Sequence, residues 1–461
     1  MQNYNFFCIY ANFGTFFCIF VAYVEKKYYL CASNLLYHET SLLIISYYMR
    51  NRLILWIALL ASCVSLYGAT PIMLVSETDT AYYETFPDAL KKANKQPSAR
   101  LTMLDNVSFE GKAAVQTIKT NLSIDLNGYT LGDSLTSDRL FSLAIDSLTL
   151  RIFSSRPNGR IRMAAKRNGS IYAVYCTKGR LEIEDITIEG SNTAEDAAAY
   201  PNAGARGVYV GAYSTLAMNH CDISLESHGV ANTLFAAGDA KSAGRMDVRN
   251  CRFTIRAVKG SSAVYCFSAL TMDSCELDVQ TELNAYGINM QAYNKDLHWT
   301  DTARVTNTRM TAVSSTKGAY GIQSKGHLYL ANDSLYAQTT YENCYALYMS
   351  QDSMSCSAVN CSFNARGTNT ALAKNVIGAS ANSTSRLTLH DCDLITEGGD
   401  GTRGIRALGD TKSACIADIR RCRIIAHGEK NSYGISCYGT SFIENCSIDV
   451  VASAGTYAYG I

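Results

Sequence analysis

Cysteine recurs at regular intervals along this chain, and periodic thiols are the first residues whose type and spacing could do chemistry. Zinc sites need closely spaced Cys-x2-Cys pairs, which the sequence lacks, so a metal is the least favoured interpretation. Disulfides between neighbouring repeats are compatible with the spacing, although parallel side chains give poor torsion angles. We expect mainly buried thiols that act as small hydrophobic residues. Seven of the 17 cysteines belong to a recurring pattern, in which the cysteine is followed by one variable residue and then by Ile, Leu or Phe at intervals of a few tens of residues, namely Cys221, Cys251, Cys275, Cys361, Cys392, Cys422 and Cys446.

Tyrosine supplies the second group of candidates. An exposed aromatic stripe could stack on sugar rings, which makes these tyrosines the candidate binding residues. The simpler interpretation, which we favour, is a stack of rings at a corner that shields the core. The five candidates are tyrosines that stand directly before a small residue and a following aliphatic residue, namely Tyr172, Tyr286, Tyr320, Tyr345 and Tyr433.

These two patterns alternate along residues 171–461 and define a repeat. Copies of the cysteine pattern, beginning at Ile186 and including Thr308 and Asp333 in place of cysteine, lie 24 to 35 residues apart. Such a period indicates a solenoid, a propeller or an array. The repeats lack helical periodicity and are too short for four-stranded blades. We therefore predict an all-β fold, a parallel β-helix solenoid of about ten or more coils with one repeat per coil.

The small-aliphatic pattern should mark one strand of each coil. We place one less regular copy near Ala231-Asn232. The clear copies are Ala173-Val174, Gly207-Val208, Ala263-Val264, Gly287-Ile288, Gly321-Ile322, Ala346-Leu347, Ala371-Leu372, Gly404-Ile405, Gly434-Ile435 and Gly460-Ile461.

Because side chains alternate along a strand, each residue of the cysteine pattern can be assigned to the inner or the outer side of the coil. The cysteine and the apolar residue point inward, and the residue between them points outward. No two successive outward residues share a charge sign, as stacking in register requires. In order they are Thr187, Asp222, Arg252, Glu276, Arg309, Ser334, Ser362, Asp393, Arg423 and Ser447. Asparagine, which tolerates left-handed backbone, precedes the pattern at Asn250, Asn307, Asn332, Asn360 and Asn445 and should form a corner.

Residues 70–170 are expected to hold an N-terminal cap and the first coils. Residues 85–94 predict a short amphipathic helix, with Thr85 as N-cap and Pro87 in the first turn. Residues 100–104 and 122–126 predict strands. This order, with the sequences Leu-Thr-Met-Leu and Asn-Leu-Ser-Ile-Asp-Leu-Asn-Gly, resembles the entry coils of bacterial right-handed parallel β-helix proteins of the pectin-lyase-like superfamily. The resemblance implies that the helix plugs the open end of the core and that asparagines stack at a coil corner.

The resemblance does not extend to a catalytic site, so no catalytic residue is assigned. Ser227-His228-Gly229 resembles the Gly-His-Gly motif of polygalacturonases, but the paired aspartates and the basic motif of those enzymes have no counterpart. The calcium-binding carboxylates of pectate lyases also have none. Asp391 and Asp393 flank Cys392 and are interpreted as a corner and a surface group. We expect no cofactor or metal, and calcium is considered only if the chain is a lyase.

The N-terminal part predicts export. Residues 49–69 combine a basic start with the apolar run 53–61, as a signal peptide does. Leu60-Ala61-Ser62-Cys63 resembles a lipobox, which would make Cys63 a lipidation site; cleavage near Gly68-Ala69 is the alternative. Residues 1–48 carry no repeat and are interpreted as a gene-model extension or as an unstructured or membrane-associated segment. The end of the chain inside a repeat predicts that further C-terminal coils are missing.

Composition and architecture together favour a binding module over an enzyme. A formal net charge of +1 gives no electrostatic argument for nucleic acid as a partner. We expect an exported protein at the cell surface, in the periplasm or outside the cell, which binds a polymer such as a glycan along one lateral face. Attachment to an outer membrane would need a lipid anchor or missing C-terminal residues. The alternatives are a polysaccharide lyase or glycoside hydrolase, and a passive structural stalk.

Overall fold

A computed structural model describes residues 70–77, 79–109, 115–134, 137–193, 203–239, 242, 244–267, 269–292, 302–409, 414–454 and 457–461. The expectations for residues 1–48, for the signal at 49–69 and for Cys63 lie outside these residues. Within the described ranges, no helix is both long and apolar enough to cross a membrane.

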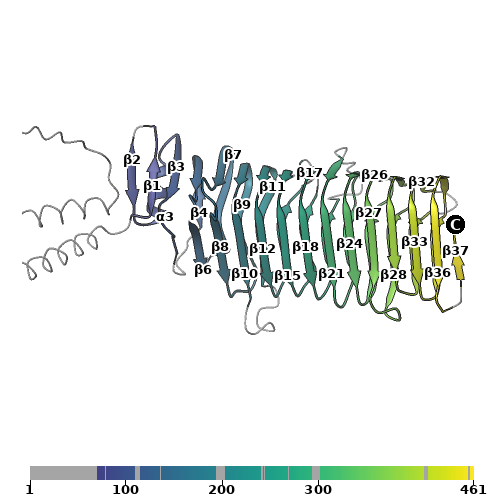
Figure 1. Cartoon of the computed structure of the whole chain (residues 1–461). Helices are drawn as coiled ribbons and strands as arrows, with labels where there is room; N and C mark the ends of the chain where they lie inside the picture. Colours follow the sequence, from purple (N-terminus) through teal and green to yellow (C-terminus); the bar gives the residue numbers. More distant parts are fainter. Residues whose placement is uncertain are drawn as a thin grey trace, which may run out of the picture. The chain divides into compact units, whose positions relative to one another are not determined.

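Parallel strands stacked coil upon coil build the unit that follows residue 68, which confirms the predicted β-helix (Figure 1). Each coil of the repeat region contributes three strands, so the strands form three stacks. The second stack is a 12-stranded parallel sheet. It consists of β6 (Thr130–Ser134), β8 (Arg160–Ala165), β10 (Thr187–Asn192), β12 (Asp222–Ser227), β15 (Arg252–Ala257), β18 (Glu276–Thr281), β21 (Arg309–Ser314), β24 (Ser334–Thr339), β27 (Ser362–Gly367), β30 (Asp393–Glu397), β33 (Arg423–Gly428) and β36 (Ser447–Ala452).

The first and third stacks are joined by three long strands that run through both, β7 (Arg139–Phe153), β9 (Ser170–Glu184) and β11 (Gly204–Asn219). The first stack also has β3 (Ser98–Met103), β5 (Asn121–Asp125), β14 (Arg245–Arg249), β17 (Leu270–Asp273), β20 (Ala303–Thr306), β23 (Leu328–Ala331), β26 (Ser355–Val359), β29 (Arg386–His390), β32 (Ile416–Arg420) and β35 (Thr440–Glu444). The third stack also has β4 (Gln116–Ile118), β13 (Ala231–Ala236), β16 (Ser261–Cys266), β19 (Ala285–Met290), β22 (Ala319–Ser324), β25 (Glu342–Met349), β28 (Ala373–Ala381), β31 (Gly401–Ala407), β34 (Asn431–Cys437) and β37 (Tyr457–Tyr459).

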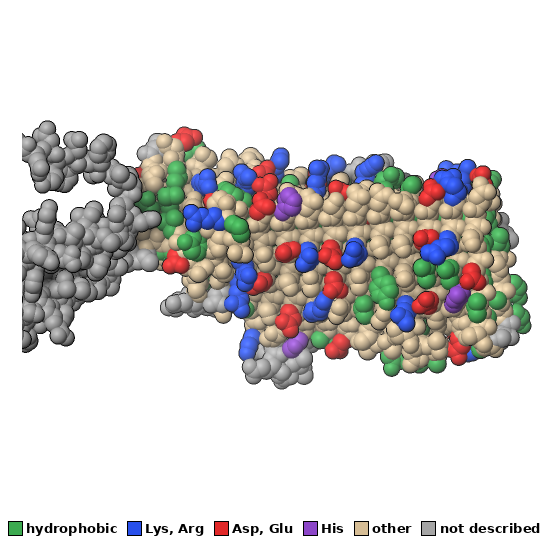
Figure 2. Space-filling model, viewed as in Figure 1, with side chains coloured by type: hydrophobic (Ala, Val, Ile, Leu, Met, Phe, Trp, Pro, Cys, Tyr) green, Lys and Arg blue, Asp and Glu red, His purple; other side chains and the backbone are tan. Residues whose placement is uncertain are grey.

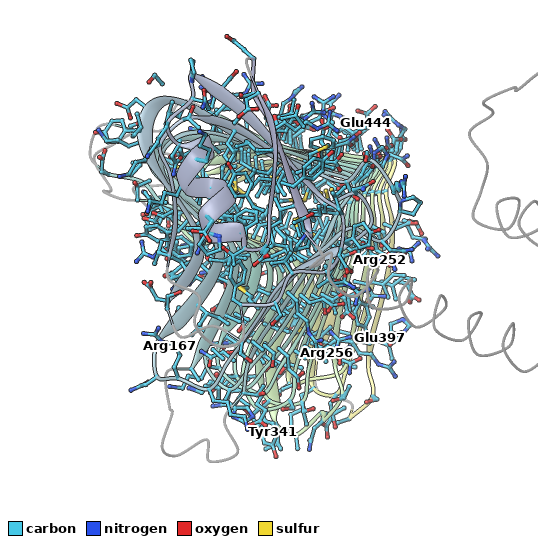
Figure 3. All side chains as sticks on the ribbon, turned by 90° about the vertical axis from the view of Figure 1, so that its left-hand side faces the viewer. Arg167, Arg252, Arg256, Tyr341, Glu397 and Glu444 are labelled. Carbon is cyan, nitrogen blue, oxygen red and sulfur yellow. The ribbon has the colours of Figure 1, made fainter. Side chains whose placement is uncertain are left out.

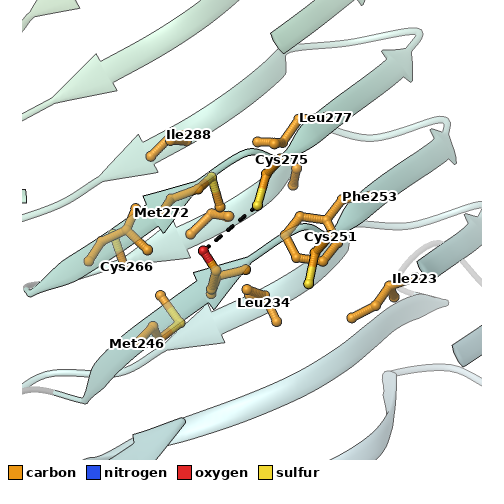
Figure 4. Packing of buried hydrophobic residues seen from close by; sticks show 14 of the residues in the cluster. Ile223, Leu234, Met246, Cys251, Phe253, Cys266, Met272, Cys275, Leu277 and Ile288 are labelled. Atoms are coloured by element: carbon orange, nitrogen blue, oxygen red, sulfur yellow. Dashed lines mark hydrogen bonds between the residues drawn. The ribbon is translucent and has the colours of Figure 1, made fainter. Parts of the chain in front are cut away.

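The periodic cysteines form part of the inner wall, as predicted. Cys251 and Cys275 are at most 4% exposed and pack beside Phe253 and Leu277 of the following strands (Figure 4). Their thiols donate to backbone carbonyls; Cys275 Sγ lies 3.2 Å from the oxygen of Asp273. The thirteen cysteines of the described ranges are all free, eleven of them buried.

A left-handed residue lies two positions before every second-stack strand from β10 onward. The residue before the inward position has φ between +50° and +58° in ten successive coils, from Asp185 to Asn445. Asparagine amides bridge some of these corners, because Asn360 Nδ2 donates to Asn332 Oδ1 at 2.8 Å and Asn332 Nδ2 to Asn307 Oδ1 at 3.1 Å. The predicted corner is confirmed, and aspartate, histidine, serine and arginine also adopt its conformation.

The outward residues of the second stack pair in the predicted register from Thr187 to Ser447. Arg252 contacts Glu276 at 3.3 Å, and Arg423 contacts Asp393 at 3.0 Å. On the surface seen in Figure 2, acidic and basic side chains are accordingly interspersed. Asp391 has φ of +55° and binds Arg421, so Asp391 and Asp393 are the corner and surface groups that the sequence indicated.

The helix α3 (Phe86–Ala93) covers the first coil, as expected, and Figure 3 shows it from that end. Its N-cap Thr85 accepts the backbone N–H of Asp88, and its buried Phe86 packs edge-on against Phe141 with ring centroids 5.8 Å apart. The sequence reasoning missed two adjoining strands, β1 (Ile72–Val75) and β2 (Thr80–Tyr83). These form an antiparallel extension of β3 that borders the helix.

Two copies of the small-aliphatic pattern were placed wrongly. Leu234 pairs with Val208 and Val264, so the pair in β13 is Thr233-Leu234 rather than Ala231-Asn232. Ala379 pairs with Leu347 and Ile405, so the pair in β28 is Gly378-Ala379 rather than Ala371-Leu372. Both errors have one cause: small residues near the true pair imitate the pattern, and only pairing between coils identifies the true copy.

Candidate functional site

The outward side of the third stack is the candidate site, and we call it the aromatic face. Its strands bend where two consecutive residues, such as Ala263 and Val264, both point inward. Outward positions are therefore three residues apart, and they align in two columns. The first column is Arg139, Tyr172, Arg206, Asn232, Ser262, Tyr286, Tyr320, Tyr345, Ile377, Arg403, Tyr433 and Tyr459. The second is Ser142, Tyr175, Tyr209, Phe235, Tyr265, Asn289, Gln323, Tyr348, Ser380, Arg406 and Ser436.

Stacked rings dominate both columns. In the second column Tyr175 and Tyr209 have centroids 4.2 Å apart, and the stack continues through Phe235 to Tyr265. In the first column Tyr286, Tyr320 and Tyr345 stack with centroid distances of 4.9 and 5.5 Å. The interplanar angles along these runs are at most 15°. The rings therefore cover one another's faces, and ring edges and hydroxyls are the parts presented outward.

The five tyrosines predicted from the sequence all lie in the first column, but only Tyr286, Tyr320 and Tyr345 form one stack. Tyr172 and Tyr433 stand apart from them along the column. Tyr345 is only 5% exposed, whereas the other four are half-buried. The three rings thus form a stack, as the favoured interpretation expected, but the stack lies on the outward side of the strands β19, β22 and β25 rather than at a corner. Whether these tyrosines bind a ligand stays a prediction.

Sequence reasoning missed the second column entirely. Strict alternation predicts the next outward residue two positions after each tyrosine. Because of the bend, that residue instead lies three positions after the tyrosine. Tyr175 and Tyr348, each three residues after a predicted tyrosine, were the available signal. Burial, together with the neighbouring Tyr175, raises the pKa of Tyr209 to about 12, so its hydroxyl stays protonated and can donate a hydrogen bond.

Arginines flank the ring stacks. The guanidinium of Arg206 lies 4.4 Å from the ring centroid of Phe235 and donates to the hydroxyl of Tyr172 at 2.9 Å. Arg406 lies 5.3 Å from the ring centroid of Tyr345 and donates to its hydroxyl at 3.2 Å. Such cation–π contacts hold a guanidinium flat against an aromatic group while its N–H edge stays accessible.

The aromatic face is basic because its two columns contain four arginines and no aspartate or glutamate among the described residues. Arg139 is neutralised by Asp138 beside it. Arg206, Arg403 and Arg406 form no salt bridge with a carboxylate of the described ranges. The exposed Glu342, at the start of β25, borders the face. Three positive charges thus remain available to a ligand.

A depression of about 400 Å³ at the asparagine corner is the competing site. Arg252, Glu276 and Arg309 line it together with Asn250 and Asn307. Its charges already satisfy one another, since Glu276 contacts Arg252 at 3.3 Å and Arg309 at 3.8 Å. The depression consequently offers an incoming ligand less uncompensated charge than the aromatic face does.

The remaining groups considered for catalysis or metal binding are not brought together. His228 lies half-buried in the turn after β12, and its Nδ1 has no hydrogen-bond partner among the described residues. In the part of the chain that the structure describes, no cluster of three or more histidine, cysteine or acidic side chains could hold a metal ion. Burial raises the pKa of Cys176 to about 11, which makes it a poor nucleophile.

Comparisons with protein-family models, curated protein sequences and solved structures found no match. The parallel β-helix therefore rests on the strand pairing itself. Membership of the pectin-lyase-like superfamily stays a prediction from the entry coils and the asparagine corner.

Proposed function

We propose that this chain is an exported β-helix module that binds an extended glycan along the aromatic face. The observation that supports the proposal is the in-register row of tyrosine hydroxyls, ring edges and unpaired guanidinium groups on one side of consecutive coils. Arg206 and Arg406 each hold a ring and a hydroxyl in place while keeping N–H donors available.

Sugar hydroxyls are suited to this chemistry because they accept hydrogen bonds from guanidinium and phenol groups. The contacts would run along ring edges, since the ring faces are covered by neighbouring rings. Coils repeat about every 4.8 Å, so one chain of sugars would meet several coils at once. Individually weak contacts then add along the polymer, because each later contact is intramolecular.

Export completes the proposal. The basic and apolar residues of 49–69 would direct the protein across the membrane, and Cys63 would retain it there if the lipobox is used. A polymer outside the cytoplasm would then be the accessible partner.

The experiment is a glycan array followed by titration calorimetry with the best neutral oligosaccharide. Arg206→Gln should weaken binding about tenfold, because it removes charged hydrogen-bond donors from the face. Tyr286→Phe combined with Tyr320→Phe should also weaken it while leaving both ring stacks intact. Arg256→Gln is the matched control: Arg256 pairs with Asp278 on the second stack and should leave affinity unchanged (Figure 3).

Equal affinities for all of these variants would contradict binding at the aromatic face. Failure to bind any polysaccharide would favour the passive stalk instead. Release of shortened products from polysaccharide, with or without calcium, would favour the lyase or hydrolase alternative.

A further inference from the structure

Two arginines stand side by side at the outward positions of a single strand. Arg403 and Arg406 both belong to β31, and the bend at Gly404 and Ile405 turns them to the same side. Both are half-buried. Burial lowers the pKa of Arg403, and the positive charge of Arg406 lowers it further. The fold thus holds two like charges together in a partly desolvated place.

Only neutral groups contact this pair among the described residues. Arg403 Nη1 donates to Gly401 O at 3.3 Å and to Asn375 Oδ1 at 3.5 Å. Arg406 donates through Nε to Ser380 Oγ at 3.0 Å and through Nη2 to the hydroxyl of Tyr345. These bonds fix both guanidinium groups, and they leave Nε and Nη2 of Arg403 and Nη1 of Arg406 without a described acceptor.

The arginines of the next coil differ from this pair because carboxylates neutralise them. Arg420, Arg421 and Arg423 each bind a carboxylate, with shortest distances of 2.7, 2.7 and 3.0 Å. A carboxylate of the same strand or of a neighbouring coil thus neutralises each of these three arginines, whereas the two arginines of β31 have no such partner among the described residues. An uncompensated pair of partly buried charges costs free energy unless an anion approaches it.

The number of available donors indicates the shape of that anion. A single arginine can donate hydrogen bonds to both oxygens of a carboxylate in a bidentate pair. Two adjacent guanidinium groups suit an ester with three terminal oxygens, as in a sulfate or phosphate ester. Tyr433 and Tyr345 lie beside the two guanidinium groups, with ring centroids 5.2 and 5.3 Å from Arg403 and Arg406, so a sugar bearing the ester would meet aromatic edges.

We propose that Arg403 and Arg406 form a binding site for a tetrahedral oxyanion ester, sulfate or phosphate, carried by a glycan. The proposal rests on the proposed function and narrows its ligand to esterified acidic glycans. The ester would lie across β31, and the sugar chain would continue along the aromatic face toward Tyr433 on one side and Tyr348 on the other.

The test compares matched oligosaccharides of one backbone: sulfated, phosphorylated, carboxylated and unsubstituted. Titration calorimetry with the whole chain should show a sulfated or phosphorylated ligand binding at least about tenfold more tightly than the unsubstituted one. Arg403→Gln and Arg406→Gln should each remove most of this preference, so that the esterified ligand loses far more affinity than the unsubstituted ligand does. Arg406→Lys should restore only part of it, because lysine lacks the planar pair of donors.

Arg421→Gln is the matched control, since it removes a neighbouring arginine that Asp391 already neutralises. Equal affinity for esterified and unsubstituted ligands would overturn this site while leaving the proposed function standing. A carboxylated ligand bound as tightly as the esters, or a single-stranded oligonucleotide bound more tightly than either, would also overturn it. Failure of every oligosaccharide to bind would instead reject the proposed function.

Discussion

Asp333 places a carboxyl group at the inward position where the next coil has Cys361 and the preceding coil has Thr308. It is 2% exposed, and its carboxylate accepts the backbone N–H groups of Thr308 at 2.8 Å and Ala331 at 3.1 Å. Burial raises the pKa of Asp333 from the ordinary 3.8 to about 7, despite these two donors, and the negative charge of Asp273 adds to the rise. Its core neighbour Cys356 is a buried thiol whose own pKa is raised.

The raised pKa makes stability depend on pH in a definite direction. Between about pH 4 and pH 7 the folded state binds more protons at Asp333 than the unfolded state does, so the free energy of unfolding falls as pH rises. A shift of about three pKa units corresponds to about 4 kcal/mol. Asp333→Asn, which resembles the protonated acid, should lack this component. The difference in stability between variant and wild type should therefore grow in the variant's favour by about 4 kcal/mol from pH 4 to pH 8.

Denaturant unfolding at pH 4, 5, 6, 7 and 8 would measure this. Asp391→Asn is the control: Asp391 is exposed, and its hydrogen bond from Arg421 lowers its pKa. Its stabilising effect is complete above the ordinary pKa and is lost only as pH falls below it, so its difference from wild type should stay constant from pH 5 to pH 8. A constant difference for Asp333→Asn over the same range would refute the reasoning, since it would mean that Asp333 titrates alike in the folded and unfolded states.

Two further predictions concern the corner and the thiols. Asn332 has φ of +58°, so the free energy of unfolding of Asn332→Ala should be about 1 kcal/mol lower than that of Asn332→Gly, as measured by denaturant unfolding. Equal stabilities of the two variants would contradict the need for a left-handed backbone at this position. Cys437 and Cys446 are half-buried and Cys176 is buried, so mass-spectrometric mapping of a thiol reagent at pH 8 should find the first two labelled well before the third; simultaneous labelling would count against the buried thiol column.

The sequence predicts the coils well because each carries a local constraint. A left-handed residue, an inward small residue and an inward apolar residue recur together, so the corner, the inner wall and the alternating charges of the second stack could be assigned without pairing information. Asp391 and Asp393 were assigned correctly for that reason. The cap helix was also predictable, because its N-cap and apolar spacing lie within ten residues.

The aromatic face was only partly predictable, because its geometry depends on a bend in the strand. The pair Ala263-Val264 is visible in the sequence, but nothing local shows that both residues point inward and move the next outward residue to Tyr265. The cysteine pattern matched Arg423 to Asp393 from the sequence alone. No comparable pattern in the sequence shows that Arg403 meets neutral groups, and only the pairing between coils reveals it.

Footprinting of the aromatic face with a bound polysaccharide tests the central claim most directly. Hydroxyl-radical labelling read by mass spectrometry reports how accessible each tyrosine is with and without ligand. Glycan binding along the face predicts protection of Tyr209, Tyr265, Tyr286 and Tyr348 together, with no change at Tyr329 on the first stack or Tyr336 on the second. Protection confined to Tyr329 and Tyr336, or none at all with ligand bound, would contradict it.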